Sequence, residues 1–453
     1  MKVLSAEWVL PISSEPIHNG AVAILNDRIV DVGRTSELHD RYPESEVESF
    51  GAAAMLPGFV NCHSHLEITA MRGYLDSVEH DFKSWLLRLN TVRSEVLTED
   101  EIRAGAIVGA VEGASAGVTC FGDVGRYGSA GFDALHLVGL RGVLFQETEF
   151  SPDNKTAADD FEKIKGRFLQ LRELQTELIQ IGISPHSPYT VSSMLFEKIS
   201  DYALAKGIKL CIHTAESTEE HELMVNGDGF FTKLYEKFNL EWISPRCTSI
   251  EFLSRIGILR VRPLLIHCVT ASESDIGLIE ATGSTIAHCP KSNAKFGHGW
   301  APFERMLDAG IAVGLGSDSV ASNNICDLLE ESRFAALGAR NRLGSNRFIS
   351  AGESLEAATL GGAKALGLED RIGTLEAGKQ ADITLISLEN FAQMPVTDVQ
   401  SALVFASSAK AVKMTMVAGN EIYRDGHVLN IDEKGLRQSL KGIETKLSSY
   451  SVD

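Results

Sequence analysis

Residues 56–65 read LPGFVNCHSH, a short apolar run that ends in two histidines. Seven similar runs follow before about Gly373, and nearly all end in polar, chemically capable residues. They are GVTCFGDVG (117–125), GVLFQETEF (142–150), IQIGISPHSPYT (179–190), IKLCIHTAES (208–217), PLLIHCVTA (263–271), STIAHCP (284–290) and IAVGLGSDS (311–319). Helical patterns such as FEKIKGRFLQLRELQTEL (161–178) separate them. Buried parallel strands with crossover helices are the expected result.

Eight such units predict an α/β fold in the form of a closed (β/α)8 barrel. The polar ends of the runs agree with this, because barrel enzymes carry their catalytic groups at the C-terminal ends of the strands. A doubly wound open sheet is the structural alternative. It would not need eight units or place functional groups after so many of them.

The two ends of the chain show short strands instead. AVAIL (21–25) and RIVDVG (28–33) are joined through Asn26 and Asp27, a plausible hairpin turn. ADITLISL (381–388) and TMVAGNEIY (415–423) are again typical of strands. We therefore expect a small β-sandwich-like domain built from residues 1–56 and 376–453, the latter including a tail, beside a barrel of residues 57–375.

Composition indicates a globular protein. Of the 453 residues 44% are hydrophobic and 23% charged, which excludes disordered, collagen-like and disulfide-scaffold classes. The net charge of −19 argues against a nucleic acid or an anionic membrane as partner. We expect a cytoplasmic protein, because no signal-like segment and no apolar run of about eighteen residues is found. The seven scattered cysteines, without a C-x-x-C pair, predict reduced and mostly buried thiols.

Several runs end in possible metal ligands. His63 and His65 are two residues apart, so the period of a strand turns both imidazoles to one face. The fifth run adds His213, and the eighth adds Asp318. Together they would make a nitrogen and oxygen ligand set suited to Zn²⁺ or Fe²⁺, with a position open for water. An isolated H-x-H pair would be an ordinary pair of surface or core histidines, but here further polar residues, including Glu216 and His267, lie at other strand ends.

The ordered motifs LPGFVNCHSH, PHSPY, HTAES, LLIHC, HCPKSN and GLGSDSVASNN, with the closing LEAGKQADI, resemble the amidohydrolase superfamily over essentially the whole chain. Within it the sequence is similar to the deaminase and chlorohydrolase branch, which includes S-adenosylhomocysteine/methylthioadenosine deaminases. The resemblance implies that His63, His65, His213 and Asp318 bind one metal ion, and that Glu216, His267 and Asp318 are catalytic. Binuclear members have a carbamylated lysine after strand 4. Here His186 ends the motif Ser-Pro-His, so we expect a mononuclear site, with Zn²⁺ first and Fe²⁺ as the alternative.

The expected reaction is hydrolytic deamination of an adenine-type nucleoside with release of ammonia. Metal binding would lower the pKa of water from about 15.7 toward about 7. Asp318 would accept a proton, Glu216 would protonate the ring nitrogen beside the amine, and His267 would stabilise the developing charge. The candidate substrates are S-adenosylhomocysteine, methylthioadenosine, adenosine and aminodeoxyfutalosine, the last because HSHLE and DFKSWL are similar to the aminodeoxyfutalosine deaminases.

Other functions remain open at this point. The chain could hydrolyse another ring substituent or base, such as a chlorotriazine, guanine, a pterin or cytosine, or it could be a non-catalytic scaffold. An N-acyl or cyclic-amide hydrolase is disfavoured by the missing lysine. In all the enzymatic cases the partner is a small molecule, and the resemblance implies a homo-oligomer.

The substrate contacts are less defined by the sequence. His186 could hydrogen-bond a ribose hydroxyl or hold its turn, and Trp85 could stack on a base or be a core aromatic. Arg72 resembles an arginine of the branch, or is a surface charge. Glu147 could contact sugar hydroxyls or face solvent, and Asn293 could line the pocket or support other groups. The roles of Glu67, Glu149 and His288 stay open, and Cys62, Cys268 and Cys289 are taken as packing residues.

Overall fold

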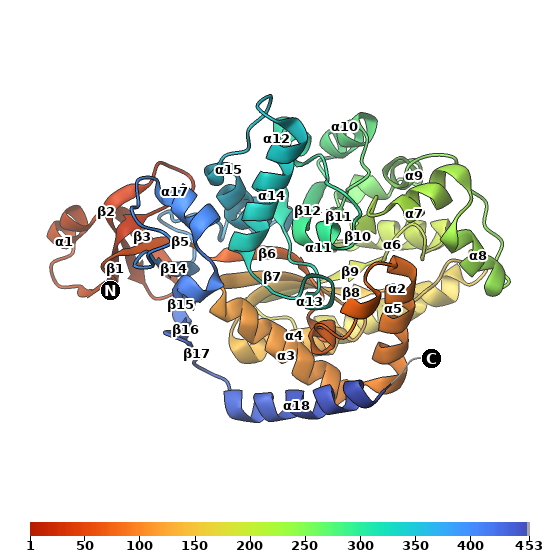
Figure 1. Ribbon diagram of the computed structural model, residues 1–453, viewed down its shortest axis with the longest axis horizontal. Helices are drawn as coiled ribbons and strands as arrows, with labels where there is room; N and C mark the ends of the chain where they lie inside the picture. Colours follow the sequence, from red (N-terminus) through yellow and green to blue (C-terminus); the bar gives the residue numbers. More distant parts are fainter. Residues whose placement is uncertain (451–453) are drawn as a thin grey trace.

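The computed structural model describes residues 1–450 (Figure 1). Each of the eight apolar runs contains one strand, as predicted. These are β6 (Phe59–Ser64), β7 (Val118–Gly125), β8 (Arg141–Glu147), β9 (Ile179–Ser184), β10 (Cys211–Thr214), β11 (Leu264–His267), β12 (Thr285–His288) and β13 (Val313–Leu315). They form two parallel sheets of four strands each, in the order β6-β7-β8-β9 and β10-β11-β12-β13.

The two sheets meet at both edges. A parallel bridge joins Ile183 to Leu210 between β9 and β10, and another joins Ser64 to Asp318 between β6 and the end of β13. Their side chains also share one core cluster, which includes Val60, Val143 and Leu264. The body of the protein is therefore a mixed α/β structure in which strands of both sheets enclose a common core.

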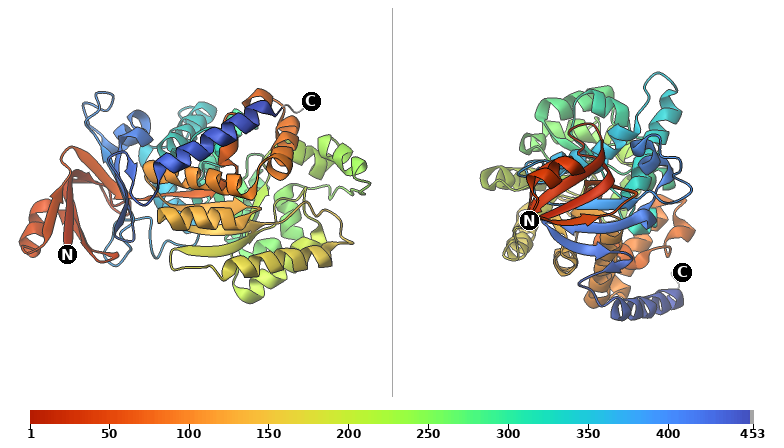
Figure 2. Two further views of the ribbon diagram at one scale, coloured as in Figure 1. Left: turned by 90° about the horizontal axis from the view of Figure 1, so that it is seen from below. Right: turned by 90° about the vertical axis from the view of Figure 1, so that its left-hand side faces the viewer.

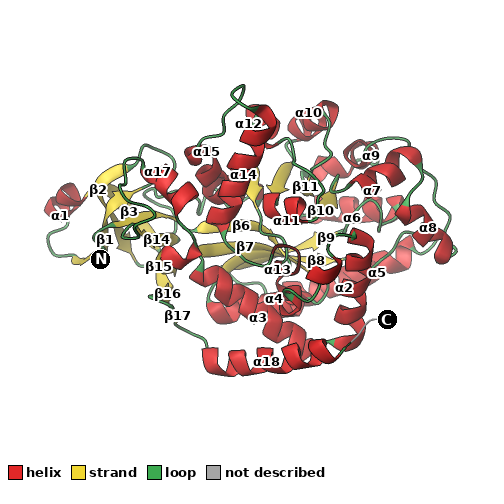
Figure 3. Ribbon diagram, in the orientation of Figure 1, coloured by secondary structure: helices red, strands yellow, loops and turns green. Residues whose placement is uncertain are grey.

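Helices surround these strands (Figure 3). The longer ones are α2 (Phe82–Thr91), α3 (Glu99–Ser115), α4 (Gly128–Val138), α5 (Ala157–Arg172), α6 (Ser193–Lys206), α8 (Phe230–Lys237), α10 (Glu273–Thr282) and α14 (Leu328–Leu343). Shorter ones are α7 (Thr218–His221), α9 (Ser249–Arg255), α11 (Pro290–Lys295), α12 (Phe303–Asp308), α13 (Val320–Asn323), α15 (Ala351–Glu356) and α16 (Gly362–Ala365). No helix within residues 1–450 is long and apolar enough to cross a membrane.

Strands from both ends of the chain come together, but the structure describes them as one sheet and not as the two layers of the expected sandwich-like domain. It contains β1 (Lys2–Val9), β2 (Ile17–Leu25), β3 (Arg28–Arg34), β4 (Glu46–Ser49), β5 (Ala53–Pro57), β14 (Ile383–Ser387), β15 (Val412–Val417), β16 (Asn420–Arg424) and β17 (His427–Val428). The antiparallel pair β5–β14 joins the N-terminal strands to the C-terminal ones. The predicted hairpin is β2–β3, where Asn26 takes the left-handed conformation (φ 56°) that such a turn needs. The sheet is continuous, with the path β17-β16-β15-β14-β5-β1-β2-β3.

The C-terminal tail leaves this sheet. The last helix, α18 (Glu433–Ser449), runs along α3 of the body (Figure 2). Two short helices also lie among the strands of the two ends, α1 (Thr35–Arg41) after β3 and α17 (Val399–Ser401) after β14. Ile443 and Leu447 are buried, and Lys446 Nζ lies 2.6 Å from Glu101 Oε2. The tail therefore covers a helix of the α/β body rather than extending the sheet.

All seven cysteines lie within residues 1–450, and each is buried and unpaired, which confirms the expected free thiols. Cys62, Cys268 and Cys289 are fully buried beside the strand ends. Burial raises the pKa of the Cys62 thiol, so it stays protonated. These side chains pack rather than coordinate.

A buried ion pair joins the sheet to the α/β body. Arg141 at the start of β8 donates from Nε and Nη2 to the two carboxylate oxygens of Asp382, both at 2.9 Å. The two side chains are 1% and 2% exposed, and Asp382 also accepts the backbone N–H of Ala418 at 2.8 Å. The two parallel hydrogen bonds offset the free-energy cost of removing the two charges from water, but only while both side chains are charged.

We predict that Asp382→Asn destabilises the protein by about 3–5 kcal/mol, because Arg141 keeps a buried, uncompensated charge. Urea unfolding followed by circular dichroism measures the change. The matched control is Glu273→Gln, which breaks the solvent-exposed pair with Arg305 and should leave the stability nearly unchanged. Equal effects of the two variants would contradict this account.

Candidate active site

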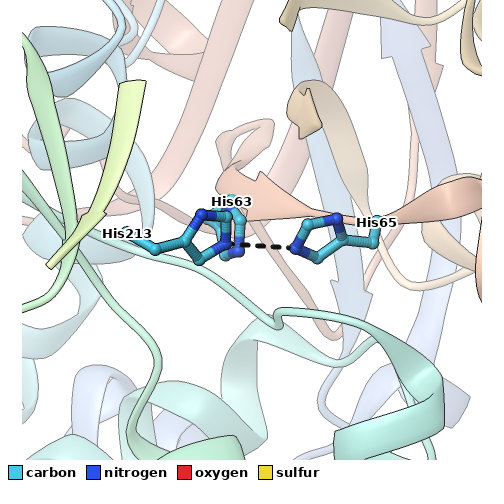
Figure 4. Close-up of side chains that lie close together, drawn as sticks. All are labelled: His63, His65 and His213. Atoms are coloured by element: carbon cyan, nitrogen blue, oxygen red, sulfur yellow. Dashed lines mark hydrogen bonds between the residues drawn. The ribbon is translucent and has the colours of Figure 1, made fainter. Parts of the chain in front are cut away.

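Three histidines from the two parallel sheets meet at their strand ends (Figure 4). His63 lies in β6, His65 follows it, and His213 lies in β10, and one nitrogen of each is within 4.8 Å of the others. The Nε2 atoms of His65 and His213 are 3.2 Å apart, as the dashed line shows. The predicted H-x-H pair and the histidine of the fifth run are therefore brought together.

Backbone carbonyls decide which nitrogens carry protons. Nδ1 of His65 lies 3.0 Å from the carbonyl oxygen of Val124, and Nδ1 of His213 lies 3.3 Å from that of His186. A carbonyl only accepts, so each Nδ1 donates and each Nε2 presents a lone pair. Two lone pairs facing at 3.2 Å repel each other, and a cation between them turns the repulsion into coordination.

Asp318 completes the cluster. Its Oδ1 lies 3.4 Å from His63 Nε2 and 3.7 Å from His65 Nε2. Two ligand atoms of one tetrahedral zinc ion, each about 2.0–2.1 Å from it, stand about 3.4 Å apart. Neither nitrogen of His63 has a hydrogen-bond partner among residues 1–450, and burial lowers its pKa to about 4, so the ring is neutral. The donor set therefore fits one divalent metal ion.

Two serines orient the aspartate. Oδ2 of Asp318 accepts the hydroxyls of Ser292 at 2.6 Å and Ser322 at 2.9 Å, while its backbone N–H donates to the carbonyl of His63 at 3.1 Å. Asp318 has a left-handed backbone (φ 55°), as does His267 (φ 73°). Such strained residues concentrate at functional sites, where the surrounding contacts hold them in place.

Glu216 and His267 form a second pair of groups. His267 Nδ1–H donates to the amide oxygen of Asn293 at 2.9 Å, which leaves Nε2 facing Glu216 Oε1 at 3.6 Å. Burial, and after it the negative charge of Asp318, raise the pKa of Glu216 to about 8. At neutral pH the Glu216 carboxyl is therefore protonated and can act as an acid.

A buried carboxyl group fixes the turn that carries Glu216. Glu220 accepts the backbone N–H groups of Ala215 at 2.8 Å and Glu216 at 2.9 Å, and its own N–H donates to the Ser217 hydroxyl. Ala215 has φ 53°, which turns the chain sharply after β10. The geometry of the acid thus depends on Glu220.

Glu147 and His186 lie beside the metal cluster. Their nearest atoms are 3.9 Å apart, and Arg93 and Arg126 approach Glu147 to 4.0 and 3.9 Å. Burial would raise the pKa of Glu147, but His186 and the two arginines hold it below its usual value. Nδ1 of His186 is committed to Thr190 Oγ1 at 2.8 Å, so Nε2 is free to face a ligand. These are polar groups suited to hydroxyls.

A cavity of about 330 Å³ connects these groups, a size that suits a small molecule. Its polar lining includes His65, Arg93, Arg126, Glu147, His186, His213, Glu216, His267 and Asp318. Its apolar lining is mostly aromatic and includes Phe82, Trp85, Phe150, Tyr189, Phe230, Phe231, Phe238 and Phe296 with several leucines. The cavity offers acid–base groups at one end and flat apolar walls for a planar ring.

The structure places two predicted contact residues elsewhere. Arg72 is partly exposed, forms an ion pair with Glu112 and does not line the cavity, which agrees with the alternative of a surface charge. Asn293 is buried behind His267 and supports that ring instead of lining the cavity. Trp85 is both a core residue and a lining residue, because its helix α2 packs one face on the core beside the cavity.

The structure also shows where the residues without an assigned role lie. Glu67 is buried, accepting Arg93 Nη1 at 3.1 Å and the backbone N–H of Tyr127 at 2.8 Å. Glu149 lines the rim of the cavity and pairs with Arg167 at 2.6 Å. His288 is buried and stacks on Phe303. Glu67 thus orients Arg93, and His288 packs below the site.

Sequence reasoning missed several residues of the site. Arg93 and Arg126 enter the cavity from a helical turn and a loop, where no pattern marked them. Glu220 did leave a signal, since Ser217 and Glu220 have the S-x-x-E spacing of a helix start. Ser292 and Ser322 lie inside quoted motifs but were not singled out. His298, whose Nε2 lies 3.9 Å from Glu216 Oε1, left no signal.

Known proteins resemble the chain over nearly its whole length. Residues 54–422 match the amidohydrolase family, and residues 20–44 match an imidazolonepropionase-like composite domain of bacteria. A 5-methylthioadenosine/S-adenosylhomocysteine deaminase of Teredinibacter turnerae is 30% identical, with 98% of this chain and 97% of that protein covered. A 5'-deoxyadenosine deaminase of Methanobrevibacter smithii is 30% identical, with 94% and 93% covered. The crystal structure of an adenosine deaminase from Xanthomonas campestris with bound zinc is 26% identical, has a TM-score of 0.89 and covers 99% of both chains.

We predict that His213→Ala loses the metal, because only two imidazoles then remain to bind it. Metal content of the purified protein, measured by mass spectrometry, tests this. His288→Asn is the matched control, since it removes a buried histidine outside the cluster and should keep one metal ion per chain. Full metal content in the His213 variant would show that these residues are not the ligands.

Proposed function

Because this chain belongs to the amidohydrolase family and is a hydrolase that acts on carbon–nitrogen bonds, we propose that it deaminates an adenine-type nucleoside and releases ammonia. The observation that carries the proposal is the buried Glu216 carboxyl group, whose Oε1 lies 3.6 Å from His267 Nε2 in the cavity that His65, His213 and Asp318 also line. Its raised pKa agrees with the role of an acid. An amine departs from an aromatic ring only when the ring nitrogen next to it is protonated, and Glu216 can supply that proton.

We propose that β6 to β13 act as one closed (β/α)8 barrel, with the cavity at its C-terminal mouth. The bridges Ile183–Leu210 and Ser64–Asp318 support this closure. In such barrels the groups that follow each strand face one another. The division into a barrel of residues 57–375 and a small domain from both ends is part of the same proposal.

One metal ion would be held by His63, His65, His213 and Asp318. Zn²⁺ is the first choice for this nitrogen and oxygen set, with Fe²⁺ as the alternative. The neutral state of His63 and the bare Nε2 atoms of His65 and His213 support the assignment. The ion would lower the pKa of water to about 7 and so supply hydroxide at neutral pH.

The protein's own residues do the rest. Glu216 gives its proton to the ring nitrogen beside the amine, and Asp318 takes the proton released by the nucleophile. His267, held by Asn293, presents its bare Nε2 beside Glu216 and can accept a hydrogen bond from the nucleophile, which orients it. Asp318 then passes the proton it took to the amine, the hydroxyl proton of the adduct returns to Glu216, and ammonia leaves with a ring carbonyl in place.

The rest of the nucleoside would occupy the polar and aromatic lining. Phe82, Trp85 and Phe296 offer walls for the planar base. The ionised Glu147 and the free Nε2 of His186 suit ribose hydroxyls. The names of the relatives support S-adenosylhomocysteine, methylthioadenosine and 5'-deoxyadenosine as substrates, with adenosine and aminodeoxyfutalosine in the same class. The homo-oligomer and the cytoplasmic location remain predictions from the sequence.

We expect metal-loaded protein to release ammonia from one or more of these adenosine compounds, and not from guanine, cytosine or a chlorotriazine. The Glu216→Gln variant should lose about 10²- to 10⁴-fold in kcat, because Gln cannot donate a proton to the ring nitrogen. Metal content should stay at the wild-type level in this variant. If the wild-type protein releases no ammonia from any compound of the panel, the deaminase proposal is wrong. If Glu216→Gln turns over normally, Glu216 is not the acid.

The activity should also fall as pH rises through about 8. The raised pKa of Glu216 means that its carboxyl group is protonated below about pH 8 and loses the required proton above it. The pH profile of kcat on the best substrate measures this basic limb. The limb should be absent from the residual activity of Glu216→Gln, and its persistence there would assign it to another group.

A further inference from the structure

His298 lies on the short loop after α11, outside the set of residues that line the cavity. Its side chain is 5% exposed, and its Nε2 lies 3.9 Å from Oε1 of Glu216. This nitrogen is buried and has no hydrogen-bond partner within residues 1–450. Buried polar atoms are nearly always paired, so an unpaired one beside an acid calls for a functional reason.

The ring is held from three sides. It meets Phe82 edge-on, with centroids 5.0 Å apart, and lies 5.3 Å from Phe296. The backbone N–H of His298 donates to the carbonyl of Asn293 at 3.0 Å. Gly297 and Gly299 on either side have φ 71° and 106°, which allow the tight loop. His298 is therefore held against the aromatic wall outside the cavity lining, with its Nε2 beside Glu216.

Once Glu216 has given up its proton, a buried carboxylate needs a hydrogen-bond donor. The titratable groups that face it are Tyr189, His267, Asp318, Glu219, Glu220 and His298. His267 uses its Nδ1–H on Asn293 and presents a bare Nε2. The oxygens of Glu220 already accept the N–H groups of Ala215 and Glu216, and Asp318 stays ionised because the neighbouring histidines lower its pKa. Glu219 acts on Glu216 through its charge, and the Tyr189 hydroxyl interacts with Ser187. His298 is the remaining group, because no other contact of its Nε2 fixes the tautomer.

We propose that His298 is a positioning residue whose Nε2–H donates a hydrogen bond to the Glu216 carboxylate after Glu216 has protonated the ring nitrogen. The inference rests on the proposed deaminase function. The proton of Glu216 moves to the substrate, and His298 keeps its own proton throughout. Burial keeps the imidazole neutral by lowering its pKa to about 4, so the bond does not need a charged histidine.

Two variants separate this role from simple packing. The amide nitrogen of Gln can occupy the place of Nε2, whereas that of Asn occupies the place of Nδ1. We expect His298→Asn to lower kcat about 10- to 100-fold, the effect of one hydrogen bond to a charged group, with KM changed less than about twofold. His298→Gln should recover to within about threefold of wild type. The basic limb of the kcat profile should move to higher pH in the Asn variant only.

A second readout does not depend on turnover. In protein labelled with carboxyl-¹³C glutamate, the Glu216 resonance is assigned by its loss in Glu216→Gln. Its titration should end at higher pH in His298→Asn than in wild type or His298→Gln, all with full metal content. An unchanged titration, or equal behaviour of the Asn and Gln variants in both readouts, would overturn the inference. If the wild-type protein is silent on every nucleoside, the proposed function fails, and the titration still decides whether His298 bonds Glu216.

Discussion

The site depends on two hydrogen bonds from imidazoles to backbone carbonyls. Val124 and His186 supply the carbonyls that hold the protons of His65 and His213 on Nδ1. The same bonds aim both Nε2 lone pairs at one point, 3.2 Å apart. Since β6 and β10 belong to different sheets, this convergence also requires the two sheets to meet. Local tautomer control and the closure of the fold are therefore linked.

The charges of neighbouring side chains give two buried glutamates different pKa values. Glu216 faces the bare Nε2 of His267, and no lysine or arginine of residues 1–450 lowers its pKa, so burial and the charge of Asp318 raise that pKa to about 8. Glu147 is equally buried, but His186, Arg93 and Arg126 lower its pKa and keep it ionised. The same residue type is thus protonated at one place and ionised at the other, which suits the proposed roles of acid and hydrogen-bond acceptor. Pairs of carboxyl groups separated in this way are a common basis of acid–base chemistry.

The sequence was sufficient for features that depend on period and order. Apolar runs predicted all eight strands of the body, and strand alternation predicted that His63 and His65 share a face. It was not sufficient for Arg72 and Asn293. Arg72 follows a short 3-10 turn (Leu66–Met71) that points it to Glu112 on α3, and α11 places Asn293 behind His267. A motif predicts which strand end a residue lies near, but the backbone angles of the turn that carries it decide where its side chain points.

Those angles are maintained by buried carboxyl groups behind the site. Asp123 accepts the Ser64 hydroxyl and the N–H of Leu66, and Glu220 accepts the N–H groups of Ala215 and Glu216. Glu331 accepts the N–H of Lys291 and the side chain of Asn323. The loops after β6, β10 and β12 are thus each tied by one acid whose pKa burial raises, to about 8, 7 and 8. An aliphatic residue there would leave buried N–H groups unpaired, which costs more than the hydrogen bonds contribute. These carboxyl groups hold the chain on both sides of His65, the left-handed turn at Ala215 that carries Glu216, and the start of α11 after β12. Part of the precision of the site therefore arises one layer behind the side chains that line it.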